Sequence, residues 1–419
     1  MPAIPYRPRV VDAELAALLR SAGAVVIEGP KACGKTATAR QVAASEVLFD
    51  IELQARELAT IDPTLVLAGA RPRLLDAWQV VPALWNHVRR AVDDADAPGS
   101  FLLTGSAVPP DDITRHTGAG RMARLRMRPM ALAESGGSTA TISLGALLAG
   151  EPPRSPDPGL SIPGLLTHCA VGGWPLHLGL DVPDALRATR DYLEAVRRTD
   201  IRRVDGVTRD PAKVGRLLQA LARHVATEVS ISTLAADAGD ADGPLARDTV
   251  ADYLTALERL GVIEDQPAWA PHLRSRARVR GSVKRHFVDP SLAVAALRAT
   301  PERLLADPNL AGLLFESLVV RDLRIYAQPL GGQVLHYRDN TGLEIDVIVE
   351  TPDGRWGAFE VKLGTARIDE AATALTRMVD KIDTSRAGPP AVLGVIVGTG
   401  YGYRRPDGVA VIPIGALGP

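Results

Sequence analysis

Short apolar runs alternate with helical patterns over the first 130 residues of the chain. The runs are rich in valine, isoleucine and leucine, as strands buried on both faces are. They cover residues 23–29, 47–53, 73–78 and 100–106. Amphipathic stretches lie between them, over residues 36–46 and 81–95. This alternation predicts a parallel sheet wrapped by helices.

The pattern changes after residue 145. A short helix and a proline-rich break at residues 150–164 lead into a helical region that ends near residue 225. From Val229 the order is helix, turn, helix and strand, which is typical of a winged helix. From Leu292 a long helix precedes five strand patterns. We therefore predict an α/β multidomain protein with four units, at residues 1–145, 146–225, 226–291 and 292–419.

Composition narrows the classes of partner. The 419 residues include 48 Lys and Arg against 49 Asp and Glu, so no chain-wide field attracts nucleic acid, and binding would need local patches. Two cysteines, Cys33 and Cys169, exclude a disulfide framework. No run approaches 18 apolar residues, and the N-terminus lacks the apolar core of a signal peptide. We expect a cytoplasmic protein that has no membrane contact.

The stretch GPKACGKT carries the strongest chemical signal. It fits G-x-x-x-x-G-K-[ST] in full, directly after an apolar run and before a helical one. Backbone amides of such a loop hold phosphates, Lys35 would reach the β- and γ-phosphates, and Thr36 would ligate Mg²⁺. The pattern predicts ATP and Mg²⁺ as cofactors, with Cys33 a small residue that faces away from the phosphates. The predicted nucleotide-binding residues are Gly29, Pro30, Lys31, Ala32, Cys33, Gly34, Lys35 and Thr36.

Two later strand ends add polar groups to this site. Asp76 closes the run RLLD and is the expected acidic partner of Mg²⁺, although a helix cap is an alternative. Thr104 and Ser106 stand at the tip of the run SFLLTGS. A hydroxyl there could sense the γ-phosphate or hold water, and an ordinary strand-ending turn is the alternative.

These motifs together resemble a known family. The resemblance spans nearly the whole chain and rests on the Walker A loop and on LLDAWQ, LLTGS, GAGRMARLRMRPMALAES, GGWP and RHFVDPSL. The chain resembles prokaryotic AAA+-type ATPases that carry a C-terminal domain of unknown function with a restriction-endonuclease-like fold. The resemblance implies that Ser106 is a sensor. It also implies that Arg121 lies near the nucleotide or acts across a subunit contact, which would require a homo-oligomer. Arg115 competes for that role, and a solvated arginine is the alternative for both.

One residue departs from the family pattern. Ala77 follows Asp76, where the family usually has glutamate. Nucleotide binding uses charge and amides rather than a base, so it should survive. The help of a general base is worth roughly 10²- to 10⁴-fold in rate. We therefore expect ATP binding with slow hydrolysis, unless Glu28 or another acid substitutes.

A basic stretch follows the second helix of the winged-helix pattern. That helix, residues 247–260, could enter a major groove, but its arginines are offset by acids. In a strand, alternating arginines would share one face and, beside Lys284 and Arg285, could contact DNA phosphates. They are Arg274, Arg276, Arg278 and Arg280. A solvated hairpin, or a winged helix that only bridges domains, is the alternative.

The C-terminal unit contains a second group of charged residues. Glu360 and Lys362 alternate in one strand, and a turn at TPDG would return them towards Asp346. The arrangement looks like the PD-(D/E)XK nuclease core, which implies that Asp346 and Glu360 bind metal, that Lys362 positions water and that Glu316 completes the site. A buried ion-pair cluster is the alternative.

The leading hypothesis is a Mg·ATP-binding protein with impaired hydrolysis whose nucleotide state alters its distal domains. An ATP-gated, metal-dependent nuclease is one alternative. A nucleotide-loaded scaffold or DNA-binding regulator without turnover is another.

Overall fold

The computed structural model describes residues 5–95, 97–105, 117–271 and 282–419. Several predicted site residues lie outside these ranges: Ser106, Arg115, Arg274, Arg276, Arg278 and Arg280. Among the described helices, none combines the length and apolar character that crossing a bilayer requires.

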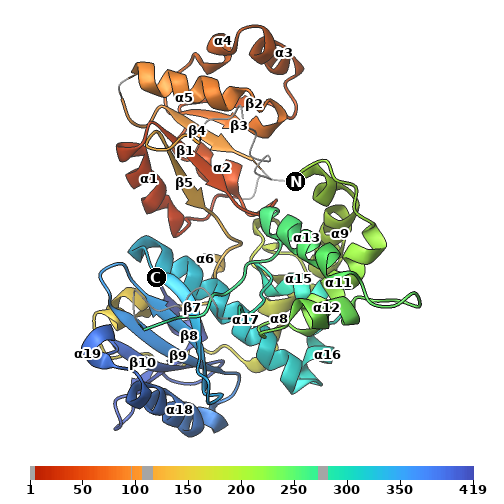
Figure 1. Ribbon diagram of the computed structural model, residues 1–419. Coiled ribbons are helices and arrows are strands. Elements are labelled where there is room, and N and C mark those ends of the chain that lie inside the picture. Colours follow the sequence, from red (N-terminus) through yellow and green to blue (C-terminus); the bar gives the residue numbers. More distant parts are fainter. Residues whose placement is uncertain (1–4, 96, 106–116, 272–281) are drawn as a thin grey trace.

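The N-terminal unit confirms the predicted parallel sheet. Its five strands are all parallel, in the order β2-β3-β4-β1-β5, and helices cover the sheet (Figure 1). The strands are β1 (Ala24–Glu28), β2 (Ser45–Leu48), β3 (Arg73–Asp76), β4 (Phe101–Thr104) and β5 (Met122–Arg126). The helices are α1 (Val11–Ser21), α2 (Lys35–Arg40), α3 (Leu53–Ile61), α4 (Pro63–Leu67) and α5 (Leu84–Ala95). The carboxyl ends of β1, β3 and β4 meet at one edge, where α/β sheets bind ligands.

The second predicted strand is shorter than its apolar run. The run covers residues 47–53, but β2 ends at Leu48, and Ile51 and Leu53 are 71% and 63% exposed. β2 is an edge strand whose four residues pair with the four of β3. Beyond that pairing the chain turns, and the Leu48 amide donates to the Glu52 carboxylate at 3.0 Å. Apolar character alone therefore overestimated this strand.

The middle of the chain is helical and shares one hydrophobic core. That core extends from Leu166 to Leu314, so it joins the helical region and the winged helix that the sequence predicts as separate units. The helices are α8 (Ile162–Val171), α9 (Val182–Ala195), α10 (Ile201–Arg203), α11 (Pro211–Arg223), α12 (Ile231–Asp237), α13 (Arg247–Arg259), α15 (Pro290–Ala296) and α16 (Pro301–Leu305). After α13, Ile263 pairs with Phe287, and Gln266 with Lys284, in antiparallel bridges. The predicted boundary at residue 291 falls inside α15.

The C-terminal unit is a mixed sheet between helices, in the order β11-β12-β10-β9-β8-β7. Along β8 and β9, Val347 and Phe359 share a core with α17, whereas Ile348 and Ala358 share another with α18. The strands are β7 (Gln333–Arg338), β8 (Glu344–Glu350), β9 (Trp356–Lys362), β10 (Val392–Val397), β11 (Tyr403–Arg404) and β12 (Ala410–Pro413). The helices are α17 (Pro308–Ala327), α18 (Ile368–Lys381) and α19 (Thr384–Ala387).

The segment after β5 crosses to the C-terminal unit. Its elements are α6 (Leu132–Ser135), β6 (Ile142–Ser143) and α7 (Leu144–Leu148), and β6 pairs with β13 (Leu417–Gly418). Leu132, Leu144 and Leu148 pack in the same core as α17. The segment that follows the N-terminal sheet is thereby joined to the C-terminal end of the chain.

A buried arginine joins all three parts of the molecule. Arg321 of α17 contacts Asp289 at 2.8 Å and Asp322 at 2.7 Å, and these side chains are at most 3% exposed. Asp289 also accepts from the Gly173 amide at 3.0 Å, and Asp322 from the Leu132 amide at 3.0 Å. One guanidinium thus positions two carboxylates, and each carboxylate accepts a hydrogen bond from the backbone of a different region, at Gly173 and at Leu132.

Replacing Arg321 with Met should strongly destabilise the fold. Asp289 and Asp322 would remain buried without a cation, and breaking a buried pair in this way costs about 3–5 kcal/mol. The free energy of unfolding from urea denaturation measures the loss. The matched control is Arg367→Met, which removes an exposed pair with Glu370 and should change stability little. Equal stability of the two variants would contradict this role of Arg321.

Candidate functional site

The loop Gly29–Thr36 leaves the carboxyl end of β1, an interior strand of the sheet, and runs directly into α2. Gly29 (φ 153°), Ala32 (φ 60°) and Gly34 (φ 105°) all have positive φ, so the backbone is tightly curved. A Cβ on Gly29 would lie 2.2 Å from the Met127 carbonyl oxygen, so only glycine fits there. Cys33 is fully buried, as expected for a residue that faces away from the phosphates.

The polar residues predicted beside this loop come together. The Lys35 ammonium is buried and donates to the carbonyls of Gly29 (2.8 Å) and Pro30 (2.7 Å). The Thr36 hydroxyl donates to Asp76 Oδ1 at 3.0 Å, and the Thr104 hydroxyl donates to the same oxygen. A hydroxyl and a carboxylate in contact at this edge are a donor set that suits Mg²⁺. The residues present therefore fit the expected metal.

Ala77 stands where a base is expected and offers only a methyl group. Its backbone is left-handed, with φ 55° and ψ 36°, and the chain then enters a short 3₁₀ turn, Trp78–Val80. Glu28, the acid named as a substitute, forms an ion pair with Arg124 on β5. Its carboxylate is thus already engaged.

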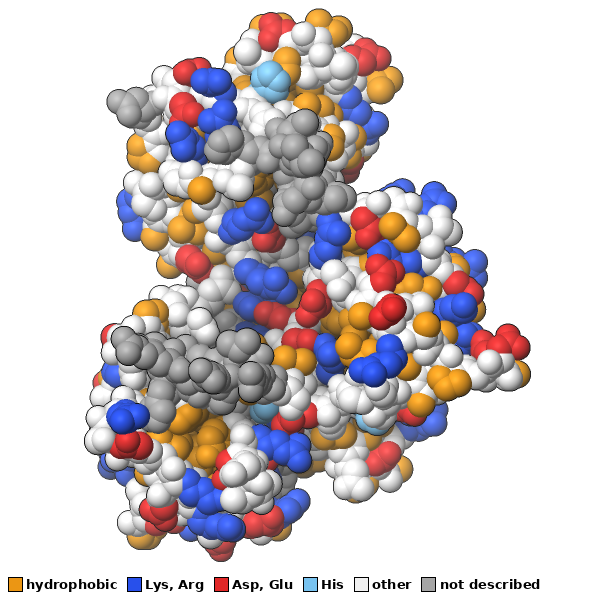
Figure 2. Space-filling view, in the orientation of Figure 1, with side chains coloured by type: hydrophobic (Ala, Val, Ile, Leu, Met, Phe, Trp, Pro, Cys, Tyr) orange, Lys and Arg blue, Asp and Glu red, His pale blue; other side chains and the backbone are white. Residues whose placement is uncertain are grey.

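A cavity of about 530 Å³ opens beside this edge of the sheet, with Gly29, Trp78 and Gly105 on one side and residues after α13 on the other. Glu258 of α13 lines it, and desolvation, followed by repulsion from Asp265, raises the pKa of Glu258. Figure 2 shows acidic and basic side chains mixed on the surface where the N-terminal unit meets the rest.

The middle unit contacts the loop Gly29–Thr36, called the P-loop below, at two points. Gly261 has a φ of +67°, and a Cβ there would lie 3.1 Å from the Pro30 nitrogen. The Lys31 ammonium lies 2.5 Å from Asp200 Oδ1, after α9. The loop that is expected to hold phosphate is therefore in direct contact with the helical core.

A second cavity, of about 330 Å³, lies on the other side of the loop. Tyr6 and Pro175 line it together with Lys35 and Thr36. Arg9 supports this wall, because its guanidinium donates to the carbonyls of Cys33 and Arg128, each at 2.8 Å. Sequence reasoning missed Tyr6 and Arg9, because no motif marks the N-terminal segment that supplies them.

Arg121 lies away from the loop within the chain. It immediately precedes β5, at the amino edge of the sheet, whereas the P-loop follows the carboxyl end of β1. Its guanidinium contacts Asp93 of α5 at 2.6 Å. The geometry thus does not place Arg121 near the nucleotide site of its own subunit. A role for Arg121 across a subunit contact stays a prediction.

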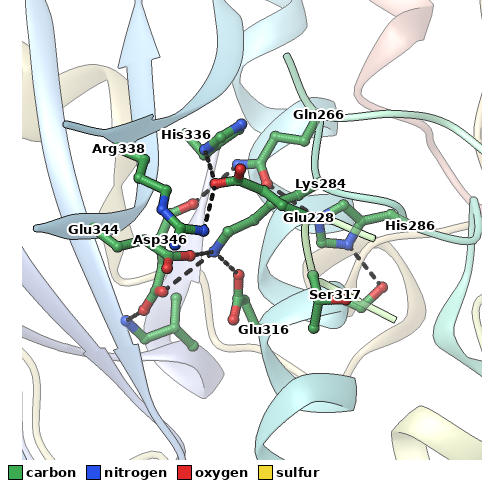
Figure 3. Close-up of polar contacts among 12 residues, drawn as sticks. Glu228, Gln266, Lys284, His286, Glu316, Ser317, His336, Arg338, Glu344 and Asp346 are labelled. Atoms are coloured by element: carbon green, nitrogen blue, oxygen red, sulfur yellow. Dashed lines mark hydrogen bonds and ion pairs between the residues drawn. The ribbon is translucent and has the colours of Figure 1, made fainter. Parts of the chain in front are cut away.

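The predicted C-terminal residues also come together, and Figure 3 shows two of them, Glu316 and Asp346, in one cluster. β8 and β9 form the predicted hairpin, and Val347 pairs with Phe359, which brings Asp346 and Glu360 to the same end of the two strands. The Lys362 ammonium lies 2.5 Å from Glu360 and 3.6 Å from Asp346. Glu316 reaches the cluster from α17.

A residue from outside the sheet completes this cluster. Lys284 is 2% exposed, and its ammonium contacts Glu316 at 2.7 Å, Glu344 at 2.8 Å and Asp346 at 3.5 Å. The expectation that Lys284 helps to form a phosphate-binding surface was wrong, because the side chain turns inward to these carboxylates. Arg285 pairs with Asp265 instead.

The charged groups of the cluster shift one another's pKa values. Burial, followed by repulsion from Asp346, raises the pKa of Glu316 to about 8 and also raises the pKa of Glu360. Burial opposes ionisation of Asp346 too, but Lys284 and Lys362 outweigh it, so the pKa of Asp346 is lowered. Within the described ranges, no three His, Cys, Asp or Glu groups are arranged to hold a metal ion. As the cluster stands, its carboxylates face ammonium groups.

Comparison with known proteins assigns three regions. Residues 21–135 match the AAA domain family, and residues 163–303 and 311–417 match two domains of unknown function, DUF8612 and DUF4143. Uncharacterized proteins of Mycobacterium bovis and Mycobacterium tuberculosis are each 26% identical over 360 residues, which is 84% of this chain and 73% of theirs. The Walker-type ATPase PABY2304 of Pyrococcus abyssi aligns with a TM-score of 0.42 at 14% identity, over 70% of this chain and 99% of that one. The AAA-domain match, on the loop described above, makes this a nucleotide-binding, P-loop ATPase-like protein.

Proposed function

We propose that the protein binds Mg·ATP at Gly29–Thr36, hydrolyses it slowly, and couples its nucleotide state to the middle and C-terminal units. The observation that carries the proposal is the convergence of Lys35, Thr36 and Asp76 at the carboxyl edge of the parallel sheet. Thr36 and Asp76 would hold Mg²⁺, which would neutralise charge on the phosphates.

Slow hydrolysis follows from the groups near Asp76. Ala77 cannot accept a proton from water, and Glu28 is paired with Arg124. Lys35 and the loop amides still bind phosphate, because binding needs charge and donors rather than a base. We therefore expect the protein to keep its affinity for ATP although it hydrolyses ATP slowly.

Two contacts support coupling to the distal units. Pro30 packs against Gly261, and Lys31 pairs with Asp200, so a change in the loop meets the helical core directly. Residues 262–266, which follow Gly261, pair with residues 284–288, which carry Lys284 into the C-terminal cluster. The chain thus offers a continuous route from the P-loop to that cluster.

The finer assignments belong to the same proposal. Helices α12 and α13 followed by the antiparallel pair support a winged helix, and the hairpin β8–β9 with its charged end supports a nuclease-like C-terminal fold. DNA contact, a homo-oligomer and a cytoplasmic location stay predictions. A scaffold or regulator without turnover is the alternative that the first two experiments below would favour if ATP binds but no variant hydrolyses it.

Lys35→Ala should weaken ATP binding by about tenfold or more, since charge-assisted hydrogen bonds to phosphate are lost. Titration calorimetry with Mg·ATP measures the affinity, and Lys213→Ala, on α11, is the control that should bind normally. Unchanged affinity in Lys35→Ala would overturn the proposed nucleotide site.

Ala77→Glu should raise ATP turnover by roughly 10²-fold while leaving affinity nearly unchanged, because it supplies the missing base. Phosphate release under saturating ATP measures the rate. Ala77→Gln is the matched control, since it has the same size but accepts no proton, and it should stay slow. Equal rates for the Glu and Gln variants would contradict the account of slow hydrolysis.

The convergence of Asp346, Glu360 and Lys362 favours a second candidate function, an ATP-gated, metal-dependent nuclease. It requires Mg²⁺- or Mn²⁺-dependent cutting of DNA or RNA that Lys362→Ala abolishes and that Lys381→Ala, a surface control in the same unit, leaves intact. Absence of cutting on single-stranded DNA, duplex DNA and RNA, with and without ATP, would reject this candidate.

A further inference from the structure

The carboxylates at the end of the C-terminal sheet surround an ammonium that the sheet does not supply. Glu344 and Asp346 belong to β8 and Glu316 to α17, whereas Lys284 belongs to the segment that precedes α15 (Figure 3). Its Nζ is 2.7 Å from Glu316 and 2.8 Å from Glu344. At these distances the ammonium occupies the space between the carboxylate oxygens.

We propose that Lys284 is a built-in cation that closes this carboxylate cluster to divalent metal ions. Oxygen ligands from several carboxylates are what Mg²⁺ and Mn²⁺ prefer. A metal ion among Glu316, Glu344 and Asp346 would meet the Lys284 ammonium within contact distance and be repelled by it. Metal binding and the position of Lys284 observed here therefore exclude each other.

The charge balance of the cluster shows why Lys284 stays. Lys362 pairs with Glu360 and reaches Asp346 only at 3.6 Å, and among the residues that the structure describes it forms no ion pair with Glu316 or Glu344. Lys284 is the cation that both of these carboxylates contact. Buried carboxylates are costly unless paired, so the cluster must hold either this ammonium or another cation.

The backbone around Lys284 fixes its approach. The amide of Lys284 donates to the Gln266 carbonyl at 3.0 Å, and the Gln266 amide donates back at 2.9 Å. The Gln266 side chain also donates to the carbonyls of Leu335 and Asp346, at 2.9 and 3.0 Å, and so ties this pair of segments to β7 and β8. These bonds fix the backbone from which the Lys284 side chain reaches the cluster.

The rim of the cluster carries further polar groups from the same units. His336 of β7 is 1% exposed, and its Nδ1 lies 3.8 Å from Glu228 and has no hydrogen-bond partner among the described residues. Arg338 lies 3.4 Å from the same carboxylate. Glu228 comes from the segment before α12. The middle unit therefore contributes both a carboxylate, Glu228, and a cation, Lys284, to this end of the sheet.

The test is Mn²⁺ binding without nucleotide, followed by electron paramagnetic resonance of the free ion. Lys284→Met should bind one additional Mn²⁺ at the cluster. Its affinity for Mn²⁺ there should be at least about tenfold higher than that of wild type. The double variant Lys284→Met with Asp346→Asn should lose that ion, which separates it from any Mn²⁺ at Thr36 and Asp76. Lys284→Arg keeps the charge and should gain nothing.

Two comparisons keep the proposal falsifiable. If Lys284→Met does not fold, Lys284→Met with Glu344→Gln removes one unpaired carboxylate and should still gain an ion, held more weakly by Glu316 and Asp346. Lys381→Met is the matched control, because Lys381 pairs with Asp339 on the surface, and it should bind as wild type does. The proposal is overturned if folded Lys284→Met variants bind no additional Mn²⁺, or if wild type binds an ion that Asp346→Asn removes. Failure of ATP to bind would leave this result unaffected, so the two proposals fail separately.

Discussion

The arrangement of the whole chain depends on one buried cation, Arg321. Its two carboxylate partners hold the backbone of Gly173, in the middle unit, and of Leu132, in the segment that arrives from the N-terminal sheet. The indole of Trp174 donates to Ser291 beside the same site. Three regions that are distant in sequence are thereby held by charge-assisted hydrogen bonds in a dry environment, where such bonds are strong and their loss is costly.

With this junction fixed, two contacts gain functional meaning. Gly261, just after α13, lies against Pro30, where a side chain would be crowded and the backbone has a positive φ, and the segment after it pairs with the strand-like segment that carries Lys284. The loop Gly29–Thr36 is thus connected to the carboxylate cluster by a packing contact at Gly261 and by the backbone hydrogen bonds between residues 262–266 and 284–288. These contacts are consistent with the proposal that the nucleotide serves as a switch and that Ala77 slows hydrolysis.

Sequence reasoning succeeded where the signal is local. The P-loop could be recognised because strand, loop and helix are consecutive, and Glu360 and Lys362 because alternation in a strand puts them on one face. β5 was not predicted, since Met122–Arg126 is an edge strand with two arginines and no apolar run. Lys284 was misread because it stands in a basic stretch, and only the tertiary fold shows that three acids, from α17 and β8, contact its ammonium. Tyr6 and Arg9 carry no pattern at all.

The central claim is that nucleotide binding at the P-loop changes the segments that lead to the C-terminal cluster. Hydrogen exchange of the amides in residues 262–266 and 284–288, measured with and without Mg·ATP, tests it most directly. The account predicts that Mg·ATP slows exchange in both segments of the wild-type protein and has no effect in Lys35→Ala. Exchange that slows only within Gly29–Thr36, while the paired segments stay unchanged, would contradict it.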